Sequence, residues 1–294
     1  MRKTALATLS TGLALTGLLG TGTATAAAHP DLVGGQRATG DTSWMVALQY
    51  DAPAYHRYGA FGCGGTLIFR DWVVTNAHCV TDPPTAPASR AASSPARYAA
   101  TAHTPIPTAA KHFTVRVGSK DRTRGGEVAT VTQVVVHPGW SWGMGAPGTP
   151  QNDIALLKLD HVVNAQPIPL AGGPAAPGDK VTLYGWGADT PSSDAALPLR
   201  LQQLATTVLP PQECADAGMY GGEICTDNPN GTDGPGPGDS GGPAVEIVGG
   251  VARLVGGCSR AAAQYPGVAP TVYTSSPDFR QWIYDTARGA PVAS

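Results

Sequence analysis

The chain has 294 residues, of which 14% are charged, and 19 Lys and Arg against 21 Asp and Glu give a formal net charge of −2. So few charges in near balance give no basis for binding nucleic acid or a charged membrane surface. The 38 Gly and 27 Pro suit a protein rich in strands and turns. A chain of this length can bury one large core or two smaller ones.

The first 26 residues have the pattern of a secretory signal peptide. Arg2 and Lys3 supply the positive start, an apolar stretch runs broadly from Ala5 to Leu19, and small residues at 24–26 form a cleavage site. The apolar stretch is short and interrupted for a membrane span, and no later stretch reaches about 18 apolar residues. We therefore expect an exported protein without a membrane anchor, and the leader has a bacterial character.

Short apolar runs rich in β-branched residues recur between turn signals and predict an all-β protein. Periodicity alone does not choose between a sandwich and a barrel. The runs are residues 44–49, 65–69, 72–75, 113–117, 128–136, 154–159, 180–184 and 244–248.

Residues 81–110 differ from the rest of the chain, because 24 of these 30 positions are Ala, Pro, Ser or Thr. Such a composition cannot bury enough apolar surface to offset the entropy of ordering, so we expect a surface insertion. Two interpretations stay open: a solvated loop without a role, or a loop that overhangs one side of a cleft and restricts access. His103 within it is expected to be solvated.

One helix is predicted at the C-terminus. Ser276 is placed to cap it, Pro277 suits the first helical position, and residues 288–289 (Arg-Gly) provide a stop. The apolar residues of its buried face are Phe279, Trp282 and Ile283.

Three segments far apart in the chain carry the residue types of a nucleophile, a base and a group that orients the base. They are residues 75–79 (Thr-Asn-Ala-His-Cys), 153–157 (Asp-Ile-Ala-Leu-Leu) and 238–243 (Gly-Asp-Ser-Gly-Gly-Pro). A serine hydroxyl is a poor nucleophile at neutral pH and needs a base within hydrogen-bond reach. His78 could take the proton of Ser240, while Asp153 would fix the tautomer of the imidazole and stabilise its charged form. The glycines around Ser240 suit a tight turn whose N–H groups point at a developing oxyanion.

Together, and in the order His, Asp, Ser, these segments resemble the chymotrypsin/trypsin family of serine proteases. The resemblance covers Leu32 to Ala287 and implies an all-β fold of two six-stranded antiparallel β-barrels, with the active site in the cleft between them. It implies a first barrel at 32–165, containing the insertion, and a second barrel with the C-terminal helix packed on it at 166–294. It assigns His78, Asp153 and Ser240 as catalytic residues, and the N–H groups of Gly238 and Ser240 as the oxyanion hole.

Five cysteines in an exported chain indicate disulfides with one cysteine left over. The family pairs the positions of Cys63 with Cys79 and of Cys214 with Cys225. Cys258 is then the odd one, because Gly236 occupies the place of its usual family partner. We expect Cys258 to be a buried, unreacted thiol, with an intermolecular bridge as the alternative.

The segment at 32–35 (Leu-Val-Gly-Gly) resembles the activated N-terminus of the family. There, a new α-ammonium inserts and pairs with the aspartate before the nucleophile, which here is Asp239. A buried carboxylate without a partner is costly, so this pair would hold the oxyanion loop in its working shape. The residue before Leu32 is Asp31, where many relatives have Arg or Lys. Either a different protease removes a short propeptide at 27–31, or the mature chain starts elsewhere.

The substrate-binding positions depart most from the family pattern. The residue six positions before the nucleophile, a carboxylate in trypsin-like members, is Gly234, with Asp233 one step early. Thr271 takes the place of a glycine of trypsins and would narrow the pocket, unless residues 266–268 are the true match and leave it open. Residues 254–258 lack the Ser and Trp of relatives, which puts support for Asp153 in doubt, although Gly256 and Gly257 still offer backbone groups to a substrate.

The sequence therefore predicts a secreted serine endopeptidase that cleaves polypeptides through an acyl-enzyme. Its preference at P1, the residue before the cleaved bond, is either small and apolar or Arg/Lys, and the former is favoured. The expected partners are polypeptide substrates and protein protease inhibitors, with a monomeric enzyme, no cofactor and no metal. The alternative is a protease-like binding protein with weak or no catalysis.

Overall fold

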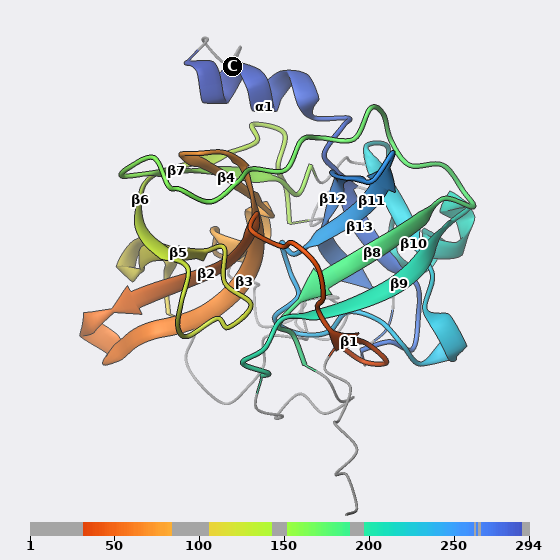
Figure 1. Ribbon diagram of the computed structural model, residues 1–294, viewed down its shortest axis with the longest axis horizontal. Coiled ribbons are helices and arrows are strands. Elements are labelled where there is room, and N and C mark those ends of the chain that lie inside the picture. The colour runs from red at the N-terminus through yellow and green to blue at the C-terminus, as the bar shows by residue number, and fades with distance from the viewer. Residues whose placement is uncertain are drawn as a thin grey trace, which may run out of the picture.

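The computed structural model describes residues 32–83, 106–142, 152–188, 197–261, 263 and 266–289. The predicted signal peptide, the propeptide and most of the insertion lie outside the described residues. Figure 1 shows two β-barrels that lie side by side. The expectation of two six-stranded antiparallel barrels is confirmed. No helix among the described residues is long and apolar enough to cross a membrane.

The first barrel closes in the order β2-β3-β4-β7-β6-β5, with every neighbouring pair antiparallel. In β5 the side chains of Phe113, Val115 and Val117 are buried and alternate with more exposed ones, as expected when one face of a strand lines a core. Its strands are β2 (Met45–Ala52), β3 (Arg57–Phe69), β4 (Trp72–Thr75), β5 (His112–Val117), β6 (Glu127–Val136) and β7 (Ala155–Leu159).

The second barrel has the order β9-β10-β13-β12-β11-β8 and closes through the pairing of β8 with β9. Its strands are β8 (Lys180–Gly185), β9 (Gln202–Leu209), β10 (Glu223–Thr226), β11 (Pro243–Val248), β12 (Val251–Ala261) and β13 (Thr271–Ser275). Short 3₁₀ helices connect the strands: η1 (Pro53–Tyr55), η2 (Ala77–Cys79), η4 (Thr108–Ala110), η5 (Pro211–Ala217) and η6 (Pro229–Gly231).

Elements at both described ends of the chain contact the barrel formed by the other half of the chain. The short strand β1 (Gln36–Arg37) pairs with β9 of the second barrel. The helix α1 (Arg280–Arg288) follows the second barrel in the chain but packs on the first, where Tyr284 lies 5.7 Å from Phe69 between ring centroids. The expectation that this helix packs on the second barrel is therefore wrong.

The start of α1 also differs from the prediction. The helix begins at Arg280, after a turn in which the Arg280 N–H donates to the carbonyl of Pro277 at 3.2 Å. Ser276 therefore does not cap the helix, and its N–H bonds the carbonyl of Val255 instead. The predicted stop is confirmed, because Gly289 ends the helix with a φ of +74°, which suits glycine.

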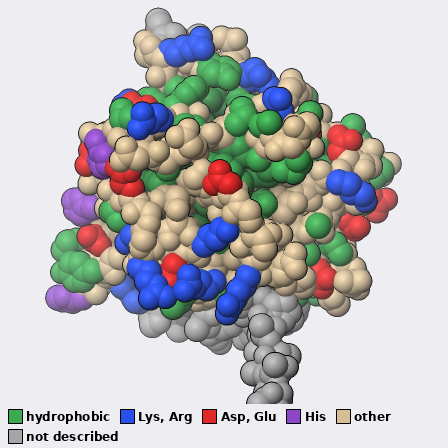
Figure 2. All heavy atoms as spheres, viewed as in Figure 1, with side chains coloured by type: hydrophobic (Ala, Val, Ile, Leu, Met, Phe, Trp, Pro, Cys, Tyr) green, Lys and Arg blue, Asp and Glu red, His purple; other side chains and the backbone are tan. Residues whose placement is uncertain are grey.

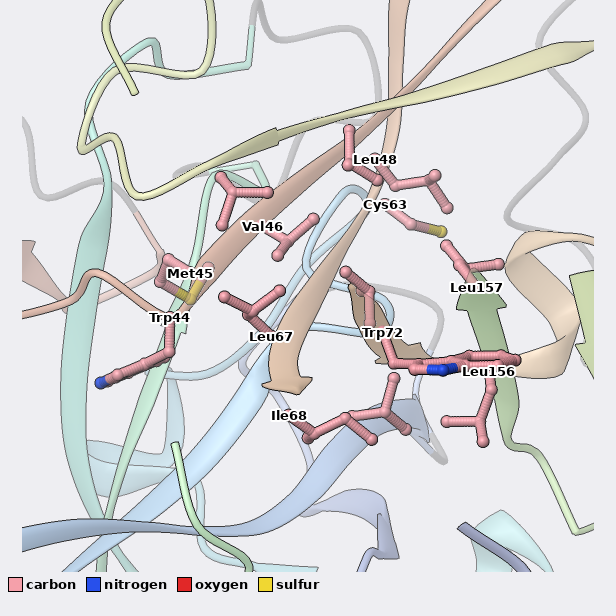
Figure 3. Close-up of a cluster of buried hydrophobic side chains, with 14 of the residues drawn as sticks. Trp44, Met45, Val46, Leu48, Cys63, Leu67, Ile68, Trp72, Leu156 and Leu157 are labelled. Carbon is pink, nitrogen blue, oxygen red and sulfur yellow. The ribbon is translucent and has the colours of Figure 1, made fainter. Parts of the chain in front are cut away.

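The core joins the two barrels. Trp44 at the start of β2 meets Tyr184 of β8 edge-on at a ring-centroid distance of 5.2 Å, and Phe61 of β3 meets Trp186 at 6.1 Å. Figure 3 shows the side chains of Trp44, Leu67 and Trp72 within one buried apolar cluster. On the face in Figure 2, acidic and basic side chains are interspersed among neutral ones, in keeping with the small net charge.

Candidate active site

The pairing of β4 with β7 brings the predicted base and its orienting carboxylate together. Thr75 at the end of β4 lies opposite Ala155 at the start of β7, so the residues just beyond these ends are neighbours. The Nδ1 atom of His78, in η2, is 2.7 Å from Oδ2 of Asp153. The backbone N–H of His78 donates to the other carboxylate oxygen, Oδ1, at 2.9 Å. The two contacts fix both the position and the orientation of the imidazole.

Asp153 is buried and receives further hydrogen bonds. Its Oδ2 accepts from Ser259 Oγ at 2.7 Å and from Asn76 Nδ2 at 3.0 Å. Burial raises the pKa of this carboxyl, but the charge and hydrogen bonds of His78 and the bond from Ser259 outweigh it and hold the pKa at about 2. Asp153 therefore carries a full negative charge at neutral pH.

The His78 side chain is 19% exposed, and its Nε2 atom faces away from Asp153. Burial lowers the pKa of His78, but the Asp153 carboxylate outweighs it, so the net pKa is raised above its ordinary value. Trp142 lies edge-on to the imidazole at a centroid distance of 6.3 Å. In the described part of the chain, Nε2 lies 3.8 Å from Cys79 Sγ and makes no hydrogen bond to Ser240.

The loop that carries Ser240 is held by backbone bonds from both barrels. The Ser240 carbonyl accepts from Gly64 N at 2.7 Å, and Gly241 N donates to the carbonyl of Cys258 at 2.9 Å. Gly238 has a φ of +98°, a conformation that favours glycine. Within the described ranges, the N–H groups of Gly238 and Ser240 donate to no protein acceptor. Two adjacent free donors beside a serine are what a developing oxyanion requires.

Asp239, next to Ser240, is buried against the loop that follows β8. Its Oδ1 accepts from Gly187 N at 2.8 Å and its Oδ2 from Gly236 N at 2.9 Å. A Cβ at Gly185 or Gly187 would overlap this carboxylate, so glycine is needed at both positions. Burial raises the pKa of Asp239 to about 7, despite the hydrogen bonds from Gly236 and Gly187.

The predicted activation segment lies in the second barrel. Leu32 is 1% exposed and belongs to the core cluster that contains Cys258 and Tyr273. The carbonyl of Val33 accepts from Gly234 N at 2.9 Å, which ties the segment to the loop that leads to Asp239.

Asp233 and Gly234, two of the predicted specificity residues, have different neighbours in the structure. The Asp233 carboxylate accepts from Asn230 Nδ2 at 2.7 Å and from Thr232 Oγ1 at 2.9 Å, and it lies against Gly34. Gly234 is buried and faces Gly267. Asp233 is thus held on the side of the activation segment.

Thr271 lies opposite Ala261 where β13 pairs with the end of β12. Its side chain is buried, and its carbonyl accepts from Thr226 Oγ1 at 3.0 Å. The register therefore places Thr271 on β13 beside the strand end that follows Ser259.

The doubt about support for Asp153, which came from residues 254–258, is resolved by the next residue of the strand. β12 continues to Ala261, and Ser259, one residue beyond that segment, donates to Asp153. Gly256 and Gly257 lie further back in the strand, opposite Ser275 and Thr274 of β13. Ser259 is therefore the residue of β12 that donates to Asp153, and sequence reasoning missed both Ser259 and its neighbour Arg260.

The cysteines brace the loops around the site. Cys63 of β3 is bonded to Cys79 of η2, and Cys214 of η5 is bonded to Cys225 of β10. Cys258 is a buried free thiol whose pKa is raised by burial. It pairs with Tyr273 across β12 and β13.

Known proteins share this sequence pattern and fold. Residues 32–283 match the model of the trypsin family. The chain is 28% identical to trypsin beta of Drosophila erecta over 269 residues, covering 87% of the chain and 88% of that protein. It is 29% identical to a trypsin of Phaedon cochleariae over 275 residues, covering 86% and 87%. Its fold is similar to that of neuropsin, a serine protease expressed in the limbic system of mouse brain, with a TM-score of 0.62, 23% identity, and coverage of 87% of this chain and 99% of that one.

The double-barrel fold with this site between the barrels defines a serine endopeptidase of the trypsin-like class. The chain belongs to the trypsin family. The trypsin relatives named here are insect proteins, so the bacterial character expected from the leader is not supported.

Proposed function

We propose that the protein is a secreted endopeptidase in which Ser240 attacks the scissile carbonyl while His78 Nε2 accepts its proton. His78 then returns the proton to the leaving amine, and water repeats the cycle on the acyl-enzyme. Asp153 holds the imidazole and stabilises its charged form, and the N–H groups of Gly238 and Ser240 receive the oxyanion. The observation that carries the proposal is the short pair between His78 Nδ1 and Asp153 Oδ2, at 2.7 Å.

Activation involves the pairing of Asp239 with a new ammonium group at Leu32. In the full chain Asp31 precedes Leu32, so no ammonium exists there. Leu32 already lies in the core of the second barrel, and Val33 is bonded to the segment before Asp239. Cleavage before Leu32 would supply the positive charge that the buried Asp239 carboxylate lacks.

A neutral, small P1 residue fits the specificity segments better than Arg or Lys. Gly234 offers no side chain to a basic group, and the Asp233 carboxylate is occupied by Asn230 and Thr232. A charge-assisted bond to Arg or Lys is therefore lacking. Thr271, a β-branched residue, narrows the site further.

The test begins with the secreted protein, a fluorophosphonate probe and mass measurement of the intact chain and its peptides. We expect one adduct, on Ser240, in a chain that begins at Leu32, and no adduct in the Ser240→Ala variant. No adduct in a chain that does begin at Leu32 would contradict the protease and favour the protease-like binding protein.

A panel of chromogenic peptides that differ only at P1 then tests specificity. We expect cleavage after Ala and Val to exceed cleavage after Arg and Lys, and Asp233→Asn to leave this ratio unchanged. Preferred cleavage after Arg that is lost in Asp233→Asn would show instead that Asp233 reaches the substrate.

A further inference from the structure

Arg260 follows Ser259 at the end of β12, and its guanidinium is fully engaged. The group is 16% exposed and forms a two-pronged pair with the buried Glu223, from Nη1 to Oε1 at 2.7 Å and from Nη2 to Oε2 at 2.8 Å. Its Nε donates to the carbonyl of Ala217, and Nη2 donates to the carbonyl of Gly218, both at 2.7 Å. Such a planar fork is rigid and always charged, so its position is fixed.

The same guanidinium reaches the hydrogen-bond system of the triad. Arg260 Nη1 lies 3.3 Å from Ser259 Oγ, and Ser259 Oγ lies 2.7 Å from Asp153 Oδ2. Consecutive side chains of a regular strand point to opposite faces, which would separate Ser259 from Arg260. Here, the register of β12 against β13 shifts between Cys258 and Arg260. A bulge of this kind re-aims side chains, and the two neighbours meet.

The chemistry of a hydroxyl gives this contact a direction. A serine O–H rotates freely and can either donate or accept, whereas an arginine can only donate. When Arg260 donates to Ser259 Oγ, the Ser259 proton is turned away from it and toward Asp153. The orientation of this proton therefore depends on Arg260 and, through the fork, on Glu223.

We propose that Arg260 is a positioning residue of the triad, which acts through Ser259 to hold the Asp153 carboxylate in place for His78. The inference rests on the proposed function of this site. Arg260 touches neither the nucleophile nor the base, and all its nitrogens are bound to protein acceptors, so it has no donor left for substrate.

The charges that face His78 have opposite effects. Asp153, before β7, raises the pKa of His78, and Arg260, on β12, lowers it. Among the described residues, the other groups placed against His78 are uncharged: the sulfur of Cys79 from η2, which is bonded to Cys63 of β3, and the Trp142 ring. Removing the Arg260 charge should therefore move the acid limb of the kcat/KM profile, which reports the base, to higher pH.

The test is a double-mutant cycle with Ser259→Ala, Arg260→Gln and the double variant, with kcat and KM measured separately on the best P1 peptide. Loss of one hydrogen bond to a charged group corresponds to about a tenfold fall in kcat for Ser259→Ala. We expect Arg260→Gln to lower kcat by about threefold to tenfold with KM unchanged, and the double variant to fall no further than Ser259→Ala. Arg253→Gln is the matched control, because it lies on the same strand and is expected to leave kcat unchanged.

Proton NMR of the full-length chain gives a second readout that needs no turnover. The Nδ1 proton of His78, bonded to Asp153, should give a far-downfield signal that shifts in Arg260→Gln and in Ser259→Ala, but not in Arg253→Gln. Arg260→Lys keeps the charge without the fork, so it should keep the acid limb near that of the parent while kcat stays reduced.

The outcomes separate the two proposals. An active parent in which losses from Ser259→Ala and Arg260→Gln add fully, or in which Arg260→Gln changes only KM, would overturn the positioning role and leave the protease intact. If the parent begins at Leu32 but neither reacts with the probe nor cleaves any peptide, the proposed function is contradicted. The inference about Arg260 would then be contradicted as well.

Discussion

Two buried aspartates, Asp153 and Asp239, lie in the same active-site region but in opposite electrostatic surroundings. Asp153 receives side-chain bonds from His78, Ser259 and Asn76, and its pKa is held at about 2. Within the described residues, Asp239 receives two backbone N–H bonds, and burial raises its pKa to about 7. Equal burial thus gives opposite charge preferences, because the charge and hydrogen bonds of His78 and the bond from Ser259 outweigh desolvation at Asp153, whereas two backbone N–H bonds do not at Asp239.

The largest effect, on peptide hydrolysis, is expected when the charge of the well-paired Asp153 is removed. Asp153→Asn keeps the shape of the site but presents an amide to His78, which favours the wrong tautomer of the imidazole. We expect kcat/KM for peptide hydrolysis to fall on the order of 10⁴-fold. The residual rate of the Ser240→Ala variant serves as the blank.

The matched control for this change is Asp160→Asn. Asp160 also lies 2.7 Å from a histidine, His161, but this pair is exposed on the surface. The variant should keep the activity of the parent. A loss of similar size in both variants would contradict the special role of Asp153.

The second-largest effect is expected for Asp239, the poorly paired aspartate. It appears in the free energy of unfolding of the full chain. Between pH 4 and 7 the folded chain keeps a proton on Asp239 that the unfolded chain releases, because the folded pKa is raised to about 7. The stabilisation that comes from this proton is therefore present at low pH. It is lost as the pH rises through this window, which lowers the free energy of unfolding by about 4 kcal/mol at most. Asp239→Asn should remove this decline, as measured by urea unfolding at pH 4 and pH 7.

Asp285→Asn, on the exposed part of α1, serves as the control and should keep the decline. A chain that begins at Leu32 should also lose it, because the new ammonium pairs with the ionised carboxylate. An unchanged pH dependence in Asp239→Asn would mean that another group is responsible.

The three segments that we propose as catalytic could be singled out from the sequence because each lies within a short local pattern. Thr75 to Cys79, Asp153 to Leu157 and Gly238 to Pro243 carry their chemistry in adjacent residues. The same holds for strands with clear apolar runs, such as β4 and β7. The strand β9 has a less clear apolar run, because its inward-facing residues include Gln202 and Thr206, which disguise the alternation.

Ser259 and the position of α1 were not accessible in this way. The bulge between Cys258 and Arg260 has no sequence signature, so nothing in the sequence pointed from Ser259 to Asp153. Likewise, the apolar face of α1 shows that the helix packs, but not on which barrel. The rings of Phe279 and Trp282 pack edge-on against His137, at centroid distances of 5.1 and 5.0 Å. His137 is far from both in the sequence.

The smallest effect is expected when one hydrogen-bond donor to the Asp153 carboxylate is removed. Asn76 is buried, and its Nδ2 donates to Asp153 at 3.0 Å and to Thr274 Oγ1 at 3.4 Å. Asn76→Ala should lower the free energy of unfolding at pH 7 by about 1–2 kcal/mol. The lowered pKa of Asp153 gives stability that is present above about pH 4 and is lost as the pH falls toward 2. With one donor gone, the folded pKa should lie closer to the unfolded value, so the acid loss in urea unfolding curves should be smaller and should end at a higher pH.

The control is Asn164→Ala, which removes the same kind of amide-to-carboxylate bond, at 3.3 Å to Glu127, from an exposed site. Water replaces a lost donor there, so the change in unfolding free energy should stay within about 0.5 kcal/mol. Equal losses in the two variants would show that burial does not strengthen the bond to Asp153. A larger loss in Asn76→Ala, together with a smaller acid loss, would show that a donor to the buried Asp153 carboxylate contributes more than the same kind of donor in water.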